Sequence, residues 1–152
     1  MDKQKERALE VRRRLLKAFG QPIWRVKLPP LDELVSTILS QNTNDVNRDR
    51  AFDNRRASFP TWELVRDAPT EAVIESIRTA GLANQKGPRI QNVLQAITEE
   101  VGSLDLAFLG DIETGEARDW LLRFKGVGPK TAAIVLLFSL NKPAFPVDTH
   151  IY

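Results

Sequence analysis

The amino-acid sequence predicts an all-α, multi-helical fold, and three observations lead to that prediction. Apolar residues recur three and four positions apart along most of the 152 residues, which is the spacing of one buried helix face. Glycine or proline follows most of these stretches, where helices commonly stop. We see no convincing strand pattern, internal repeat or low-complexity tract. We therefore expect helices packed around one sizeable core.

The composition narrows the class of protein. Hydrophobic residues make up 42% of the chain and charged residues 28%, as in a globular domain. Because no apolar run approaches the roughly 20 residues that cross a bilayer, we expect no membrane partner. The charged N-terminal stretch lacks the apolar core of a signal peptide. We therefore expect an intracellular protein, cytoplasmic or nucleoid-associated, or nuclear if the source is eukaryotic.

Two further counts bear on partners and cofactors. The formal net charge of +2, with 22 basic residues, is compatible with an anionic partner. The absence of cysteine excludes disulfides and thiolate-ligated metals within these residues. The sole histidine, His150, is predicted to be structural, and no metal site can be assembled around it.

The first predicted helix covers residues 5–19 and ends at Gly20. Its apolar stripe consists of Ala8, Val11, Leu15 and Phe19, beside arginines that form a solvated face. Residues 21–30 hold three prolines and predict a linker between two lobes. A second helix then begins at Leu31 and contributes to the core through Leu39.

A polar cluster at residues 40–45 can cap a third helix that runs through Phe52. This helix is basic because of Arg48, Arg50, Arg55 and Arg56. Thr61 and Thr70 are predicted to cap two short helices, the second of which ends at Gly81.

Leu82 comes directly after that glycine. A hydrophobic residue in this position commonly packs back against its own helix, here on Ile77. Residues 90–101 then form a clean amphipathic helix that ends at Gly102. A short apolar element leads to Thr114, which is predicted to cap the next helix.

Residues 114–140 predict two apolar helices joined by a very tight turn. The stripe of the first helix consists of Ala117, Trp120, Leu121 and Phe124, and this helix ends near Lys125. Gly126 and Gly128 permit the positive φ values that end a helix and reverse the chain. Pro129 suits the first turn of the second helix, which runs through Leu140.

A turn with two glycines lets a phosphate oxygen approach the free N–H groups that begin the second helix. Gly126 and Gly128 therefore indicate a phosphate clamp that does not depend on nucleotide sequence. The alternative is a helical hairpin whose glycines serve only close helix packing. These residues alone leave the two interpretations equally open.

Two motifs together narrow the choice. Gly-Val-Gly-Pro-Lys-Thr-Ala at residues 126–132, followed by Val-Asp-Thr-His at 147–150, resembles the helix-hairpin-helix base-excision DNA glycosylases (HhH-GPD) typified by endonuclease III. The resemblance covers roughly residues 31–152, and the paired motifs are more specific than either alone. Phe124 and Lys125 stand where the family usually has Leu-Pro, so a slightly different hairpin geometry is expected.

The resemblance implies a two-lobe DNA glycosylase fold. Its boundaries would be an N-terminal helix of the second lobe at 1–20, a linker at 21–30, a six-helix lobe at 31–140 ending in the helix-hairpin-helix at about 114–140, and a crossover at 141–152. Relatives continue with more helices and often four cysteines that hold a [4Fe-4S] cluster. We therefore expect the C-terminal part to be missing, and expect such a cluster, if there is one, in that part alone.

The resemblance also assigns roles to single residues. Lys130 would attack C1′ of the sugar, and Asp148 would stabilise the positive charge that develops there or help to take a proton from the amine. Gln41 would fill the gap left by an extruded base, and Leu82 would enter the base stack as a wedge. The hairpin residues that would hold the DNA backbone are Lys125, Gly126, Val127, Gly128 and Thr131.

Residue type alone gives plainer interpretations, because a lysine near a helix start is usually solvated and an aspartate before a helix is usually a cap. An ordinary lysine has a pKa of about 10.4, so a nucleophilic one needs a desolvating site or nearby positive charge. We expect the apolar second helix and the hairpin N–H groups to supply both to Lys130.

These features predict a monomeric DNA glycosylase with associated lyase activity, which acts on double-stranded DNA with an oxidised pyrimidine. Attack by Lys130 would release the base and leave a Schiff base, and β-elimination would then break the strand. Alternatives are a mismatch or methylcytosine glycosylase and a non-catalytic helix-hairpin-helix module. Lys130 favours an enzyme, since a clamp needs no amine there.

Overall fold

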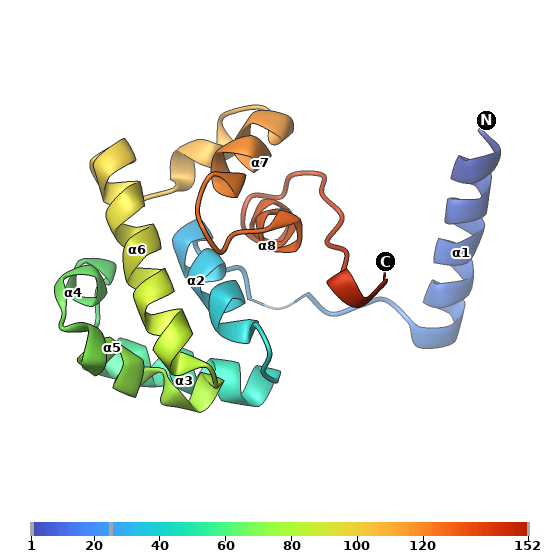
Figure 1. Cartoon of the computed structure of the whole chain (residues 1–152). Coiled ribbons are helices and arrows are strands. Elements are labelled where there is room, and N and C mark those ends of the chain that lie inside the picture. The colour runs from blue at the N-terminus through green and yellow to red at the C-terminus, as the bar shows by residue number, and fades with distance from the viewer. Residues whose placement is uncertain (1, 25, 152) are drawn as a thin grey trace.

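The structure, a computed structural model, describes residues 2–24 and 26–151, so Met1, Arg25 and Tyr152 lie outside the described residues. Every regular element within them is a helix, which confirms the all-α prediction (Figure 1). The α-helices are α1 (Lys3–Phe19), α2 (Pro30–Ser40), α3 (Asp45–Ser58), α4 (Trp62–Asp67), α5 (Thr70–Ser76), α6 (Ala83–Val101), α7 (Thr114–Leu122) and α8 (Pro129–Ile134). Short 3-10 turns are η1 (Arg78–Ala80), η2 (Ala107–Gly110) and η4 (Thr149–Ile151), and η3 (Val135–Ser139) is a π-turn.

The hydrophobic core is built around α2. This helix contacts α3, α6 and α8, and its residues Leu34, Ile38 and Leu39 are fully buried. The buried apolar residues extend along the chain from Leu31 to Leu136. The periodic stripes predicted for α2, α6 and α7 therefore form one continuous core.

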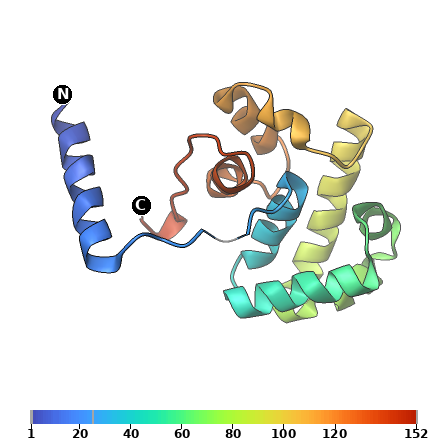
Figure 2. The same ribbon diagram turned by 180° about the vertical axis from the view of Figure 1, so that it is seen from behind.

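Helix α1 stands apart from this main body, at the end of an extended segment (Figure 1 and Figure 2). It begins at Lys3 after the cap Asp2, two residues before the predicted start, and ends at Gly20 as the sequence predicts. None of its residues is buried, and Phe19 is 83% exposed. The two-lobe arrangement, in which this stripe would be covered, stays a prediction. None of the helices described here has the length and apolar character needed to cross a membrane.

Helix α6 begins at Ala83, seven residues before the predicted stretch 90–101. The predicted helix caps agree with the structure in two cases and differ in two. Thr61 caps α4 by accepting a hydrogen bond from Leu64, and Asn44 of the polar cluster caps α3. Pro69 rather than Thr70 precedes α5, because the Thr70 hydroxyl donates instead to Gln91 at 2.8 Å. Glu113 similarly precedes α7, and Thr114 is already helical.

Helix ends also differ from the prediction. Helix α3 continues past Phe52 to Ser58, and α5 gives way to η1 before Gly81. The helix after the hairpin widens into the π-turn, where the N–H of Leu140 donates to the carbonyl of Val135. Such π-turns are rare, and those that do occur are frequently found at functional sites.

Candidate active site

The hairpin between α7 and α8 has the tight geometry that the sequence predicts. The N–H of Val127 donates to the carbonyl of Phe124 at 3.0 Å, and Gly126 has a φ of +90°. The prediction of a positive φ at Gly128 is wrong, because its φ is −96° and its ψ −178°. The ring of Pro129 explains this, since a residue before proline is pushed towards extended backbone.

The two glycines have different surroundings. A Cβ atom at Gly126 would lie 2.4 Å from Cδ of Arg89, whereas one at Gly128 would meet nothing within 4 Å. Close packing therefore accounts for Gly126 and leaves Gly128 unexplained. Val127 is 5% exposed and belongs to the core, so only its backbone is available at the surface, while Lys125 is exposed.

Lys130 and Asp148 are brought together although 18 positions separate them. Nζ of Lys130 donates to Oδ2 of Asp148 at 2.5 Å, and the N–H of His150 donates to Oδ1 at 3.0 Å. The pKa of Asp148 is lowered below its usual value. The main cause is the hydrogen bond from Lys130, and the second is the bond from the N–H of His150. This carboxyl group is therefore ionised at neutral pH and caps η4.

The desolvation expected for Lys130 is absent from the free protein. Its side chain is 45% exposed, and that of Asp148 is 40% exposed. The reason is position, since Lys130 is the second residue of α8 and lies at the helix end rather than on the buried face of Thr131 and Ala132.

The pair opens into a cleft of about 510 Å³. The cleft is formed by the end of α2 with the following loop, the start of α8 and the segment around Asp148. Its lining residues are Thr37, Ser40, Gln41, Asn42, Thr43, Gly128, Pro129, Lys130, Thr131, Asp148 and His150. Four sequence-predicted site residues, Gln41, Gly128, Thr131 and the lysine, therefore share one cleft with Asp148.

Gln41 is held between the hairpin and α6. Its Nε2 donates to the carbonyl of Gly126 at 3.5 Å, and Arg89 donates to its Oε1 at 3.0 Å. Arg89 thus contacts both the hairpin and Gln41. This role of Arg89 was not predicted, because an arginine in the second turn of an amphipathic helix is usually solvated.

Leu82 lies at a separate tip. Its side chain is 46% exposed and does not belong to the hydrophobic core, unlike the fully buried Ile77. Its φ of +50° is in the left-handed region, where leucine is strained. The shallow depression beside it is lined by Arg78, Ala83, Asn84 and Gln85, and not by residues of the Lys130 cleft.

The residues described here include no group of three His, Cys, Asp or Glu side chains that could hold a metal ion. A [4Fe-4S] cluster, which is expected only outside these residues, needs four ligands that are usually cysteine thiolates, and the sequence has no cysteine. These residues therefore do not fit the cluster.

Comparison with known proteins agrees with this geometry. Residues 35–152 match the family model described as HhH-GPD superfamily base excision DNA repair protein. A putative DNA glycosylase of Arabidopsis thaliana is 43% identical over 122 residues, which are 80% of this chain and 42% of the relative. Endonuclease III of Sulfolobus acidocaldarius is 38% identical over 120 residues, 78% of this chain and 51% of the relative. The chain thus spans about half the length of these curated relatives.

Solved structures give the same result. The trapped endonuclease III–DNA covalent intermediate has a TM-score of 0.76 at 25% identity. The match covers 99% of this chain and 66% of the endonuclease III chain. The 8-oxoguanine glycosylase/lyase of Clostridium acetobutylicum bound to double-stranded DNA has a TM-score of 0.75 at 25% identity, covering 98% and 55%. Together with the hairpin and the lysine–aspartate pair, these matches show that the chain belongs to the HhH-GPD superfamily of base excision DNA repair proteins.

Proposed function

We propose that this chain carries the active site of a DNA glycosylase with associated lyase activity. The observation that supports the proposal most directly is the 2.5 Å contact between Nζ of Lys130 and Asp148 in an open cleft beside the hairpin. A clamp that only binds phosphate has no need of an amine paired with an ionised carboxylate.

The pair can perform the first chemical step. As a proton passes from Lys130 to Asp148, the freed lone pair attacks C1′ of the extruded nucleotide. The new N–C1′ bond forms while the glycosidic bond breaks, and the base leaves with the electrons of that bond. The alternative role needs Asp148 to keep its charge: if the proton of Lys130 passes to solvent instead, the ionised carboxylate lies close enough to the attacking amine to stabilise positive charge on the sugar.

The second step breaks the strand. Opening of the sugar ring converts the N–C1′ bond into a protonated Schiff base, which makes a C2′ proton acidic. Loss of that proton drives β-elimination, in which the C3′–O3′ bond breaks and the 3′ phosphate leaves with the bonding electrons.

DNA would provide what the free protein lacks. A duplex seated on the hairpin would place a phosphate against the backbone at Gly128, where no side chain blocks its approach. The extruded nucleotide would then cover the cleft and exclude water from Lys130, whose side chain is 45% exposed in the free protein.

We further propose that the substrate is double-stranded DNA with an oxidised pyrimidine. The support is the likeness to endonuclease III, both in sequence and in its trapped DNA complex. The shape of the nucleotide pocket decides between such lesions and mismatched or methylated bases.

Borohydride trapping tests the proposal, because the reagent reduces a Schiff base to a stable amine. Natural full-length protein should form a covalent complex with duplexes that carry an abasic site or an oxidised pyrimidine. Lys130→Ala should abolish the complex, while Lys125→Ala, which removes an exposed lysine beside the hairpin, should still form it at saturating protein. If the natural protein traps none of a panel of damaged duplexes, a non-catalytic DNA-binding module is the better explanation.

A further inference from the structure

Lys86, in the first turn of α6, is a fully buried charged side chain that lies outside the proposed active site, and among the described charged residues only Glu33 is buried to the same degree. Its exposed fraction is 1%, although lysine is almost never fully buried unless its ammonium group finds partners. Such a residue needs an explanation other than solubility, and the chemistry proposed for Lys130 does not use it.

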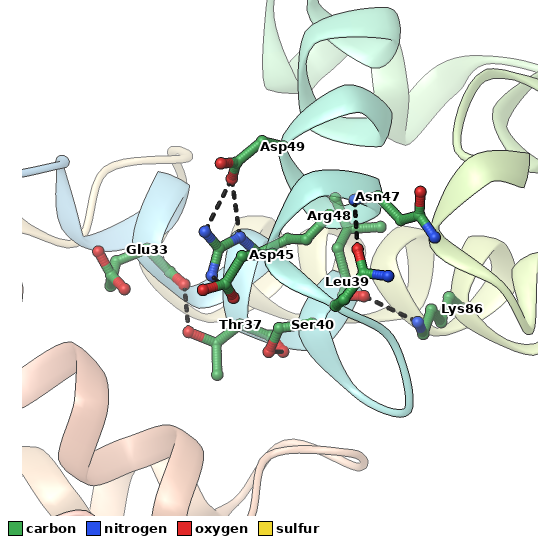
Figure 3. A network of polar contacts seen from close by, with 10 residues as sticks. Glu33, Thr37, Leu39, Ser40, Asp45, Asn47, Arg48, Asp49 and Lys86 are labelled. Atoms are coloured by element: carbon green, nitrogen blue, oxygen red, sulfur yellow. Dashed lines mark hydrogen bonds and ion pairs between the residues drawn. The ribbon is translucent and has the colours of Figure 1, made fainter.

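The contacts of Lys86 reach two other elements. Nζ donates to the carbonyl oxygen of Leu39 at 2.8 Å, as Figure 3 shows, and to that of Ala80 at 2.9 Å. Its backbone N–H donates to the carbonyl of Leu82 at 2.9 Å. Leu39 lies in the last turn of α2 and Ala80 ends η1, so the ammonium group satisfies carbonyls that have no partner within their own helix.

Each of these two helix ends leads, within two residues, into a residue to which the family resemblance assigns a role in the DNA stack. Gln41 follows the end of α2, and Leu82 follows the end of η1. Both loops hold a residue in the left-handed region, Asn42 with a φ of +53° and Leu82 with a φ of +50°. The loops approach each other, since a Cβ atom at Gly81 would lie 4.0 Å from the carbonyl oxygen of Asn42.

We propose that Lys86 is a positioning residue for base extrusion, which ties the Gln41 loop to the Leu82 loop so that both enter the base stack at a fixed spacing. The proposal rests on the proposed glycosylase function. Because Lys86 is buried, it cannot itself contact phosphate, and its effect must pass through the two loops.

Replacing lysine by methionine removes the donors while it keeps an unbranched side chain of similar length. The carbonyls of Leu39 and Ala80 would lose their partner, and the strained backbone at Asn42 and Leu82 would be free to relax. A displacement of about 1 Å in a positioned group can cost on the order of a hundredfold in rate. The loss should appear only where the enzyme must open an intact stack.

The test compares Lys86→Met with Lys142→Met in the natural full-length protein. Lys142 is a matched control, because its Nζ also donates to a backbone carbonyl, that of Ile112 at 2.5 Å, away from both loops. Each variant is assayed by borohydride trapping on a fully paired duplex and on one with mismatched flanks around the lesion. A 2-aminopurine base next to the lesion reports unstacking by its fluorescence, and this readout does not depend on chemistry at Lys130.

We expect Lys86→Met to slow trapping on the paired duplex by about tenfold or more, and on the mismatched duplex by less than about threefold. The 2-aminopurine signal should fall in parallel, Lys86→Arg should restore part of it, and Lys142→Met should change neither. Affinity for undamaged DNA and its salt dependence should stay unchanged. An equal loss on both duplexes, or no loss on either, would overturn the proposal.

Two outcomes need a further measurement. If natural protein traps nothing but still raises 2-aminopurine fluorescence, the lyase proposal fails while the positioning of the loops remains testable by fluorescence. If Lys86→Met does not fold, a double-mutant cycle of Gln41→Ala and Leu82→Ala replaces it. Loops tied together should give a combined loss of unstacking that differs from the product of the single losses, whereas simple multiplication would contradict the role of Lys86.

Discussion

The side chain of Arg89 lies directly over Gly126, so that a Cβ atom there would approach Cδ, Nε and Cγ of Arg89 to 2.4, 2.8 and 3.0 Å. The same arginine donates to Gln41, whose amide reaches back to the carbonyl of Gly126. Arg89, Gln41 and Gly126 therefore join α6, the end of α2 and the hairpin to one another. Gly128, two positions later, has no such neighbour.

This difference separates the effects of two alanine substitutions. Gly126→Ala should lower the free energy of unfolding by roughly 1–3 kcal/mol, because its φ is positive and its Cβ would overpack Arg89. Gly128→Ala should leave unfolding within about 0.5 kcal/mol and should weaken binding to duplexes of any flanking sequence. Thermal denaturation and dissociation constants for two unrelated duplexes measure both. Unchanged affinity in Gly128→Ala would mean that DNA is held elsewhere.

Asp148→Asn keeps the size of the side chain and removes its charge. Borohydride trapping should slow by about 10²–10⁴-fold, the usual contribution of a group that accepts a proton in the transition state. Affinity for DNA with an abasic site should change little, because the change is made beneath the nucleotide rather than at the hairpin. A trapping rate within twofold of the natural protein would contradict the role proposed for this carboxylate.

Leu82→Gly should remove the wedge without loss of stability. The left-handed backbone at Leu82 costs roughly 1–2 kcal/mol, and glycine relieves this cost while losing a side chain that is half-exposed. Leu39→Ala is the control for a buried leucine. Truncating this fully buried side chain should lower the free energy of unfolding, measured in urea, by about 2–5 kcal/mol. The 2-aminopurine signal should fall in Leu82→Gly. A melting temperature well below that of the natural protein would show that the tip is packed.

Lys86 gives a prediction for pH. Burial, with the nearby charge of Arg89, lowers its pKa from 10.5 to about 8 in the folded protein. Between pH 8 and 10.5 the unfolded chain binds the extra proton, so the free energy of unfolding contributed by this group should rise with pH by up to about 3 kcal/mol. Below pH 8 the folded protein carries the full destabilisation that comes from burying the protonated amine of Lys86. Urea unfolding of Lys86→Met should lack this rise, and identical pH profiles would disprove the assignment.

The neutral amine keeps two N–H donors, which is the number of carbonyls that Nζ contacts. The tie between the two loops should therefore survive deprotonation. The 2-aminopurine signal of natural protein should change little between pH 7.5 and 9 on that account. A steep fall over this range, absent from Lys86→Met, would show that the positive charge itself is needed.

Local patterns predicted much of the fold. The stripes of α2, α6 and α7 follow from helical periodicity alone, because these faces pack on one core. The extended backbone at Gly128 was also open to prediction, since it follows from the proline after it. That Thr70 does not cap α5 could not be predicted, because its hydroxyl binds Gln91, which lies 21 positions further along the chain on another helix.

The candidate site was predictable in part. The pairing of Lys130 with Asp148 came from the resemblance of two motifs, and the spacing between them shows nothing of their contact. Arg89 and Lys86 were missed because their roles depend on partners 48 and 47 positions away. A lysine in a polar stretch at a helix start looks solvated until the neighbouring helices are in place. Sequence periodicity reports burial of apolar faces and has no corresponding signal for a buried ammonium group.

The π-turn after α8 makes the site sensitive to residue number. One additional residue per turn is accommodated between Val135 and Ser139, immediately before the chain leaves for Asp148. Deleting a single residue there would convert the turn into ordinary α-helix and rotate the exit by about 100°. The segment after the turn would then leave in a different direction and carry the carboxylate of Asp148 away from the amine of Lys130. We therefore expect a one-residue deletion in this turn to separate Lys130 from Asp148, whereas a volume-conserving substitution at a buried position such as Leu136 should keep them in contact.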